Sequence, residues 1–390
     1  MTGESRGSEE LDSIYTPEHE MFRETVRRFI EKEMEPNLKT WDEAGSVDRA
    51  IWYKAGAAGL LGLGIPESYG GSGADDLYSV IVAEELGHFP CGASVGASIT
   101  SDIATHLLVH SGSEAQKQEW FPKILSGQAI QGLGLTEPGA GSDVAGIVTR
   151  ARRVGDHFLL NGNKTYISNG YIADVLYVVA KTDDHTGSHD MTLFLVDMRT
   201  EGVVQRRLKT MGAALYDVGE IFFEDVKLHE DNILGQEGKA FRVLLSTFAL
   251  DRIQLAARSL AAAELAFDLT LEFVKNRKAF GQRIFDFQNT QFKLAEMKTE
   301  LTVGRDFLNA CITRYARNTF DMSVAAMAKN WLCEMEQRVA NECLQLHGGA
   351  GYMDEYTISR IYTNARLQTI YAGTTELQKV AIAKSLDQSG

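Results

Sequence analysis

The chain has 390 residues, enough for two or three domains, and its 44% hydrophobic and 24% charged content is ordinary for a soluble globular protein. A formal net charge of −14 without any basic cluster argues against binding to nucleic acid or to a membrane. No apolar run reaches the ~18–20 residues that span a bilayer, and the polar, acidic N-terminus resembles neither a signal nor a transit peptide, so we expect a cytoplasmic protein.

The cysteine and histidine patterns favour neither disulfides nor metal binding. Cys91, Cys311, Cys333 and Cys343 show no CxxC spacing, which is typical of free, mostly buried thiols. The nine histidines include no HExxH motif, and we predict no metal site.

The first 128 residues read as an all-helical domain that follows a loose tail at 1–14. Thr16 and Pro17 are typical of a helix start, and Phe22, Val26 and Phe29 recur at the spacing of one buried helical face. Further helices are predicted at 47–59, 77–87, 99–111 and 113–126.

Residues 129–237 read as a central β domain. Short β-rich runs occur at 157–160, 175–180, 192–196 and 219–223. Turns are predicted between them at 155–156, 161–162 and 183–187. This spacing predicts a small antiparallel sheet or barrel.

Residues 238–390 read as a helical bundle, because no proline follows Pro138. Leu260, Ala263, Phe267, Leu271 and Val274 form one apolar stripe, and residues 322–345 carry another. The fold class predicted for the whole chain is therefore α+β.

Residues 131–143 read Q-G-L-G-L-T-E-P-G-A-G-S-D, a mixture that suits neither a helix nor a strand. Glycine lets a ligand approach the backbone closely, and hydroxyls can hydrogen-bond a ring or a phosphate. A surface turn is the alternative. The string closely resembles the flavin-facing segment of the acyl-CoA dehydrogenases. With the motifs below, the resemblance covers roughly residues 15–385 and is closest to the long-chain type, which implies that family's fold. It implies FAD contacts at Leu133, Leu135, Thr136, Gly141 and Ser142, with Ser142 also against the acyl-CoA.

Two further motifs extend the resemblance. In K-T-Y-I-S-N-G (164–170), Tyr166 and Ile167 would flank the flavin and Ser168 would hydrogen-bond near its N5 atom. The alternative is a strand with one buried tyrosine. In N-R-K-A-F-G-Q-R-I-F-D-F-Q (276–288), the resemblance implies a site for the pyrophosphate and adenosine of a neighbouring subunit's FAD, and a planar guanidinium suits a phosphate. A solvated charged helix end is the alternative. The residues implied there are Arg277, Phe280, Phe287 and Gln288.

The last two motifs lie near the C-terminus. Q-L-H-G-G-A-G-Y (345–352) resembles a cofactor segment with candidates Gln345, Leu346, Gly348 and Gly349. Y-A-G-T-T-E (371–376) would close over the flavin with Thr374 and Glu376, while Gly373 would contact substrate. A cofactor shared between subunits implies an oligomer, and the resemblance implies a homotetramer.

The catalytic base is where this chain departs from most of the family. Most members carry the base as Glu in Y-E-G-T, but this chain has Ala372. The long-chain and isovaleryl types place it on a helix before an arginine, which corresponds here to Asp251, with Arg252 and Arg242 assigned to the substrate. Aspartate is about 1.5 Å shorter than glutamate, and a misplacement of that order can lower a rate about 100-fold. A structural Asp–Arg pair on a helix surface is the alternative.

Our leading hypothesis is an FAD-dependent dehydrogenase that converts a medium, long or branched acyl-CoA into a trans-2-enoyl-CoA and passes electrons to an electron-transfer flavoprotein. A second hypothesis is a flavin oxidase or desaturase that acts on a carrier-bound or non-CoA substrate. A third is a non-catalytic partner subunit, which the alanine at position 372 keeps open.

Overall fold

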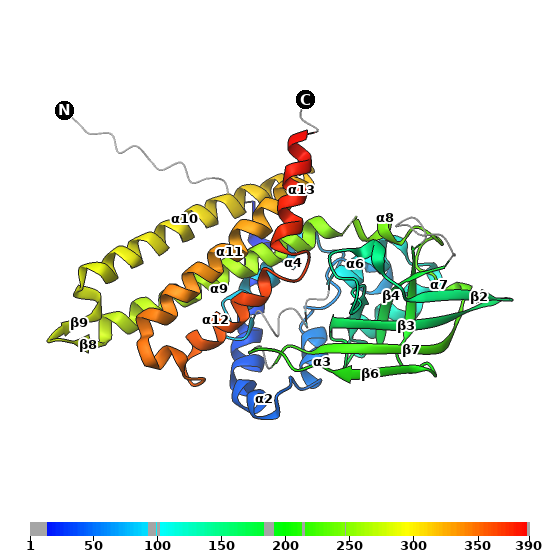
Figure 1. The fold of residues 1–390 in the computed structure, drawn as a ribbon, viewed down its shortest axis with the longest axis horizontal. Coiled ribbons are helices and arrows are strands. Elements are labelled where there is room, and N and C mark those ends of the chain that lie inside the picture. Colours follow the sequence, from blue (N-terminus) through cyan, green and yellow to red (C-terminus); the bar gives the residue numbers. More distant parts are fainter. Residues whose placement is uncertain are drawn as a thin grey trace.

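The computed structural model describes residues 14–92, 99, 102–182, 191–212, 215–245 and 247–387, so the predicted turn at 183–187 and almost all of the predicted tail lie outside it. Its N-terminal part is helical (Figure 1). The elements are α1 (Pro17–Phe29), η1 (Ile30–Met34), η2 (Glu35–Asn37), α2 (Leu38–Ala44), α3 (Ala50–Ala57), η3 (Glu67–Tyr69), α4 (Asp76–Gly87), α6 (Asp102–Ser111) and α7 (Glu114–Leu125).

Most predicted helices of this region are present. Thr16 caps α1 by accepting a hydrogen bond from the His19 amide, and Ser113 caps α7 in the same way. The helix predicted from residue 99 is described continuously only from Asp102. Helix α2 was not predicted, because its seven residues form less than two full turns of amphipathic pattern.

A seven-stranded sheet follows, in the order β1-β4-β2-β3-β7-β6 with β5 paired to β4. The strands are β1 (Gln131–Gly134), β2 (Arg150–Val154), β3 (His157–Ser168), β4 (Val175–Lys181), β5 (Met191–Asp197), β6 (Val203–Arg207) and β7 (Val218–His229). Most pairs are antiparallel, as predicted, but β4 pairs in parallel with β1 and β2.

The predicted turn at 161–162 is wrong, because both residues lie within the continuous strand β3. The pairing of β3 with β7 shifts register between Leu160 and Gly162, which marks a bulge. Gly162 has φ 139°, and an added Cβ would lie 2.5 Å from the Thr149 hydroxyl. The glycine therefore allows a close backbone approach inside a strand rather than a chain reversal.

The C-terminal part is helical again. It contains η6 (Glu230–Asn232), α8 (Ala240–Leu245), α9 (Phe248–Asn276), β8 (Lys278–Ala279), β9 (Gln282–Arg283), η7 (Ile284–Asp286), α10 (Gln288–Ala316), α11 (Met322–His347), η8 (Gly348–Tyr352), α12 (Thr357–Gln368) and α13 (Thr375–Asp387). The predicted stripe is confirmed, because Leu260, Ala263, Phe267 and Val274 belong to the buried core between α9, α10 and α11.

Helix α9 connects the two ends of the molecule. Figure 1 shows its first turns beside α8 and the sheet, and its last turns at the far tip of the bundle beside the β8–β9 hairpin. All four cysteines are buried and free, as predicted. Among the helices described, none is both long enough and apolar enough to cross a membrane.

Candidate active site

The glycine-rich segment after β1 is fastened to β3 by a buried ion pair that sequence reasoning missed. The Lys164 ammonium lies 2.7 Å from the Glu137 carboxylate, and the two side chains are 0% and 2% exposed. Glu137 also accepts the backbone amides of Val148 and Thr149, and Lys164 donates to the Leu135 carbonyl. Burial opposes ionisation of Glu137, but Lys164 and these amides hold its pKa below the usual range. The pair therefore shapes the turn that carries Thr136 and Ser142.

Tyr166 is presented to solvent rather than buried, so the alternative of a buried strand tyrosine is wrong. Its side chain is 69% exposed and its φ is 58°, a left-handed conformation that is uncommon outside glycine. The adjacent Ile167 is buried, and a register shift between Lys164 and Ile167 turns the ring outward. A large aromatic ring held outward at a bulge can contact a planar ligand.

Ser168 is held by a residue that sequence reasoning did not single out. Its hydroxyl forms a short hydrogen bond with the buried Tyr216 hydroxyl. The neighbouring Asp217 accepts the Tyr171 amide, and its own carbonyl accepts the Asn169 amide. The end of β3 is therefore fixed to the segment that precedes β7. The tyrosine lies far from any predicted motif in sequence, so only the fold could reveal the contact.

Some of the glycines in the predicted cofactor motifs border open space. An added Cβ at Gly141, Gly281, Gly348 or Gly349 would meet nothing within 4 Å. Ser142 is exposed at the same turn, while Leu133, Leu135 and Thr136 are partly buried behind it. A ligand could therefore approach the backbone closely at these motifs.

The third motif forms a two-residue hairpin at the tip of the bundle. Phe280 and Gly281 connect β8 to β9, with φ of 52° and 82°, as in a type I′ turn. The Phe280 side chain is 96% exposed and touches only the edge of Phe287, 6.2 Å between ring centroids. Arg277 and Gln288 are exposed beside it, so a flat and negatively charged ligand portion could bind here.

The fourth motif adjoins this hairpin. Phe273 near the end of α9 stacks on His347 at the end of α11, 4.3 Å between ring centroids. Gln345, Gly348 and Gly349 are exposed there, and Leu346 is partly buried. The third and fourth motifs therefore come together at one end of the bundle.

The predicted base lies at the other end of α9. Asp251 is in the first turn of the helix, whereas Arg277 follows its last residue, about 39 Å away at roughly 1.5 Å of rise per residue. One bound dinucleotide cannot reach both ends within a single subunit. The structure thus separates the predicted cofactor residues into two groups.

Asp251 lies partly buried among positively charged side chains, and we call this surrounding the recess. Burial raises the pKa of Asp251, while Arg258, Arg252 and Lys329 oppose that rise. The positive end of the helix dipole also favours the anion at this position.

The fifth motif forms a turn beside this recess. Ala372 and Gly373 have φ of 52° and 85°, and Lys329 donates to the Gly373 carbonyl at 2.8 Å. Thr374 is partly buried and Glu376 is exposed, and hydrogen bonds from the backbone and from Thr374 lower the pKa of Glu376. Because the electrostatic influence of both Asp251 and Glu376 reaches Lys329, the turn and the predicted base belong to one group.

Tyr216 joins the end of β3 to this group. Burial raises its pKa, and the charges of Arg258 and Asp251 also reach its hydroxyl. Arg258 in turn donates to the Tyr371 hydroxyl at 2.7 Å. Ser168, Tyr216, Asp251 and the 371–376 turn are therefore neighbours in the fold.

The two predicted substrate arginines differ in their surroundings. Arg252 is half-buried, with its guanidinium 5.9 Å from the Phe248 ring centroid, and burial lowers its pKa. Arg242 lies exposed in the last turn of α8. Both are on elements that adjoin the recess, so a polyanionic ligand entering there would meet them.

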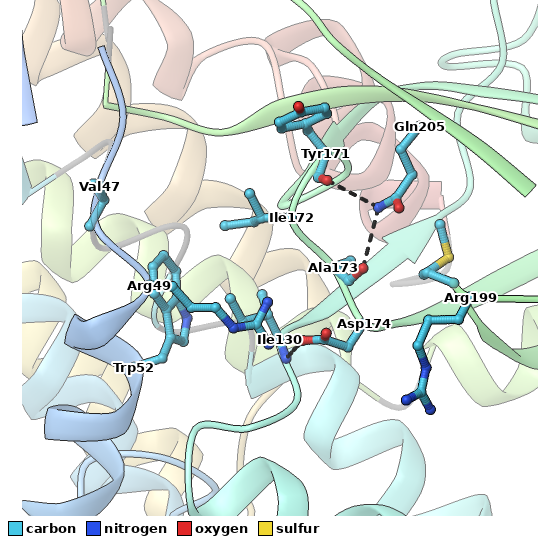
Figure 2. Close-up of a pocket in the computed structure, with 11 residues that line it drawn as sticks. Val47, Arg49, Trp52, Ile130, Tyr171, Ile172, Ala173, Asp174, Arg199 and Gln205 are labelled. Atoms are coloured by element: carbon cyan, nitrogen blue, oxygen red, sulfur yellow. Dashed lines mark hydrogen bonds and ion pairs between the residues drawn. The ribbon is translucent and has the colours of Figure 1, made fainter. Parts of the chain in front are cut away.

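Figure 2 shows a different pocket, of about 370 Å³, between α3 and the segment that follows β3. None of the predicted site residues lines it. Arg49 forms an ion pair with Asp174, and Gln205 donates to the carbonyls of Tyr171 and Ala173. These contacts hold the segment that follows Ser168 in place, and none of the side chains that make them is free to act as a catalytic group.

Histidines 106 and 110 form an HxxxH pair on α6, a spacing that could suit a metal and that sequence reasoning missed. Their rings stack with centroids 6.1 Å apart, and His106 lies 3.7 Å from Asp76. Within the part of the chain that the structure describes, no group of three potential ligands is found.

Comparison with known proteins gives one consistent result. Residues 16–128 match the model described as the N-terminal domain of acyl-CoA dehydrogenases, residues 132–226 match the middle domain, and residues 238–386 match the C-terminal domain. A relative from Mus musculus, "Long-chain specific acyl-CoA dehydrogenase, mitochondrial", is 41% identical over 96% of this chain and 87% of its own length.

Two solved structures agree with this match. An acyl-CoA dehydrogenase from Geobacillus kaustophilus superposes with a TM-score of 0.92, at 41% identity over 96% of this chain and 99% of its own. A glutaryl-CoA dehydrogenase from Mycobacterium smegmatis, solved in complex with FADH2, superposes with a TM-score of 0.87, at 28% identity over 96% of each chain. From its three matched domains and its fold, the chain belongs to the acyl-CoA dehydrogenase family, which are oxidoreductases that act on CH–CH groups.

Proposed function

We propose that this protein dehydrogenates an acyl-CoA between its α and β carbons, with FAD as its cofactor and Asp251 as the base. The observation that carries the proposal is the position of Asp251 in a cationic recess beside Ser168 and the 371–376 turn. Ala372 cannot accept a proton, so the carboxylate that the reaction needs must come from another element.

The α-proton of a thioester is weakly acidic, so the base must be ionised and close to it. Burial favours protonated Asp251, whereas three cations and the helix dipole favour the carboxylate, so the group stays able both to accept a proton and to release it. Arg252 and Arg242 are suited to the negatively charged CoA. Ser142, exposed on the glycine-rich turn, would contact the acyl group, and Gly373 would lie along the thioester.

Bound FAD would supply the acceptor for the β-hydride. The exposed Tyr166 and the fixed Ser168 hydroxyl fit a flavin ring, and the open glycine at position 141 leaves room for its close approach. Because Arg277 lies about 39 Å from Asp251, and Phe280, Gln288 and Gln345 are at the same end of the bundle as Arg277, these residues would hold the adenosine half of a cofactor bound to another subunit. This arrangement supports an oligomer, and the homotetramer that we propose follows from the resemblance to the family. The Mycobacterium relative with FADH2 supports the choice of cofactor.

An electron-transfer flavoprotein is the proposed electron acceptor. A relative from Acetobacterium woodii, 34% identical over 95% of this chain, is named as a subunit of a caffeyl-CoA reductase–Etf complex. We favour a medium, long or branched acyl-CoA as the substrate. With the base on a helix, position 372 is occupied by a small alanine, which leaves space near the α carbon for such an acyl chain. The long-chain name of the mouse relative supports this choice.

The test compares Asp251→Ala, Asp251→Glu and, as a control, Asp268→Ala at an exposed position on the same helix. Each purified variant is mixed anaerobically with butyryl-, octanoyl-, palmitoyl- and isovaleryl-CoA, and flavin bleaching is followed. We expect Asp251→Ala to lose about 10²–10⁴-fold in bleaching rate with its flavin content unchanged, and Asp251→Glu to retain activity.

Near-normal bleaching by Asp251→Ala would disprove the role of Asp251. If no acyl-CoA bleaches a yellow protein, the substrate proposal is wrong. Rapid reoxidation of the reduced flavin by air would instead indicate an oxidase.

A further inference from the structure

Lys329 is a buried ammonium in the middle of α11. Its side chain is fully buried, with 0% exposure, and among the described residues no carboxylate forms an ion pair with it. A buried, unpaired ammonium is unfavourable unless hydrogen bonds and nearby opposite charges compensate it. Such a group persists in a fold only where the surrounding structure supports it.

The hydrogen bond of Lys329 goes to the turn beside the recess. Its Nζ donates to the Gly373 carbonyl at 2.8 Å, and Gln378 Nε2 donates to the same oxygen at 3.0 Å and to the Ala372 carbonyl at 3.1 Å. The Ala372 φ of 52° is a strained value for a residue with a Cβ. Two buried donors therefore hold this turn in a conformation that its sequence does not favour.

The charges that face Lys329 come from three helices. Burial lowers the pKa of Lys329, while the Cys333 thiol on α11, Asp251 on α9 and Glu376 on α13 oppose that effect and Arg252 adds to it. Asp251 in turn is faced by Arg258, Arg252 and Lys329, with the Tyr216 and Tyr371 hydroxyls nearby. Lys329 bonds the backbone of the Ala372–Gly373 turn and also influences the carboxylate, whereas Arg258 reaches the turn through the Tyr371 hydroxyl.

We propose that Lys329 is a positioning residue for the dehydrogenation, which holds the Ala372–Gly373 turn in its left-handed conformation and supplies part of the positive charge that favours the carboxylate form of Asp251. The second role rests on the proposed function, whereas the first depends on the hydrogen bond alone.

The test uses Lys329→Met, which keeps the side-chain length, Lys329→Arg, which keeps the charge, and Lys379→Met as an exposed control next to the same turn. The holoenzymes are compared by flavin content and by hydrogen exchange of the peptide that covers residues 371–379. Their kcat/KM with palmitoyl- or octanoyl-CoA is then measured from pH 5 to pH 9.

We expect Lys329→Met to bind FAD, to exchange amide hydrogens faster at this peptide and to move the acidic limb of kcat/KM to higher pH. The direction follows because removing a nearby cation raises the pKa of the carboxylate that must be ionised. Lys329→Arg should restore most of the limb position, and Lys379→Met should resemble the wild type.

Unchanged exchange in a folded, flavin-loaded Lys329→Met would overturn the structural role. An unmoved acidic limb, in a protein where Asp251→Ala is inactive, would overturn the electrostatic role. Persistent activity of Asp251→Ala would count against the proposed base instead, and the exchange measurement would still decide whether Lys329 holds the turn.

Discussion

Replacing Lys164 by methionine would test how the glycine-rich segment is held in place. The substitution preserves most of the side-chain volume but leaves Glu137, which is 2% exposed, without its counter-ion. Breaking a buried pair by removing one partner costs about 3–5 kcal/mol. We therefore expect a large loss in the free energy of unfolding without a large cavity.

The loss in the free energy of unfolding can be bounded, because Glu137 can bind a proton in the folded variant instead of remaining a buried, unpaired carboxylate. From the ordinary Glu pKa of 4.5, protonation at pH 7 spans 2.5 units at 1.36 kcal/mol each, or about 3.4 kcal/mol. Protonation also weakens the charge-assisted hydrogen bonds from the Val148 and Thr149 amides. We expect Lys164→Met to lower the free energy of unfolding by about 3–4 kcal/mol at pH 7.

The pH dependence adds a second constraint. In the wild type, burial disfavours the Glu137 carboxylate, but Lys164 holds the pKa of Glu137 below 4.5. The stabilisation by the ion pair is therefore present above pH 4.5, and it is lost as the pH falls through the lowered pKa of Glu137 in the folded protein. In the variant the pKa of Glu137 lies above 4.5. The stability gap between the two proteins should therefore narrow as pH falls from 7 to 5.

The assay is equilibrium urea unfolding of the flavin-saturated proteins, followed by tryptophan fluorescence and far-ultraviolet circular dichroism. Lys227→Met, at an exposed lysine on β7 of the same sheet, is the control and should change stability by less than about 0.5 kcal/mol. The double variant Glu137→Gln/Lys164→Met should recover part of the loss, because no charge remains buried. A loss below about 1 kcal/mol, or a gap that widens in acid, would refute the reasoning.

Two other substitutions probe distant parts of the chain. Arg277→Ala removes an exposed guanidinium from the bundle tip and should leave the fold intact. It should weaken FAD binding by about 10–100-fold, which is the effect of losing one charge-assisted hydrogen bond. Equilibrium dialysis measures the FAD affinity, and an unchanged affinity would contradict the role of Arg277 in cofactor binding. Burial raises the pKa of Glu336 to about 8, so stability should fall as pH rises from 4.5 towards 8, by about 1.4 kcal/mol for each unit of the raised pKa. Glu336→Gln should remove that dependence and be more stable than the wild type at pH 8, which urea unfolding at pH 5 and pH 8 would reveal; parallel curves would show that Glu336 is not buried as a neutral acid.

Local patterns predicted much of the fold, because they depend on neighbours in sequence. The Thr16 and Ser113 caps, the apolar stripe of α9 and the strands of β4 and β5 follow from spacing and propensity. The positions of β1 and of the bulge at Gly162 did not, because both depend on backbone pairing with distant strands. Glycine has no side-chain pattern from which such pairing could be predicted.

By itself, the sequence determined the family, the α+β order of helices, sheet and helices, and the motif residues, because these are properties of residue type and spacing along the chain. Only the tertiary structure decided which of those residues meet. It set Asp251 beside Lys329 on α11 and Tyr216 in the segment before β7, and it placed Arg277 at the other end of the helix that carries Asp251. Contacts such as Lys164–Glu137 and Tyr216–Ser168 join residues far apart in the chain, and their energies depend on burial, which exists only after the chain has folded.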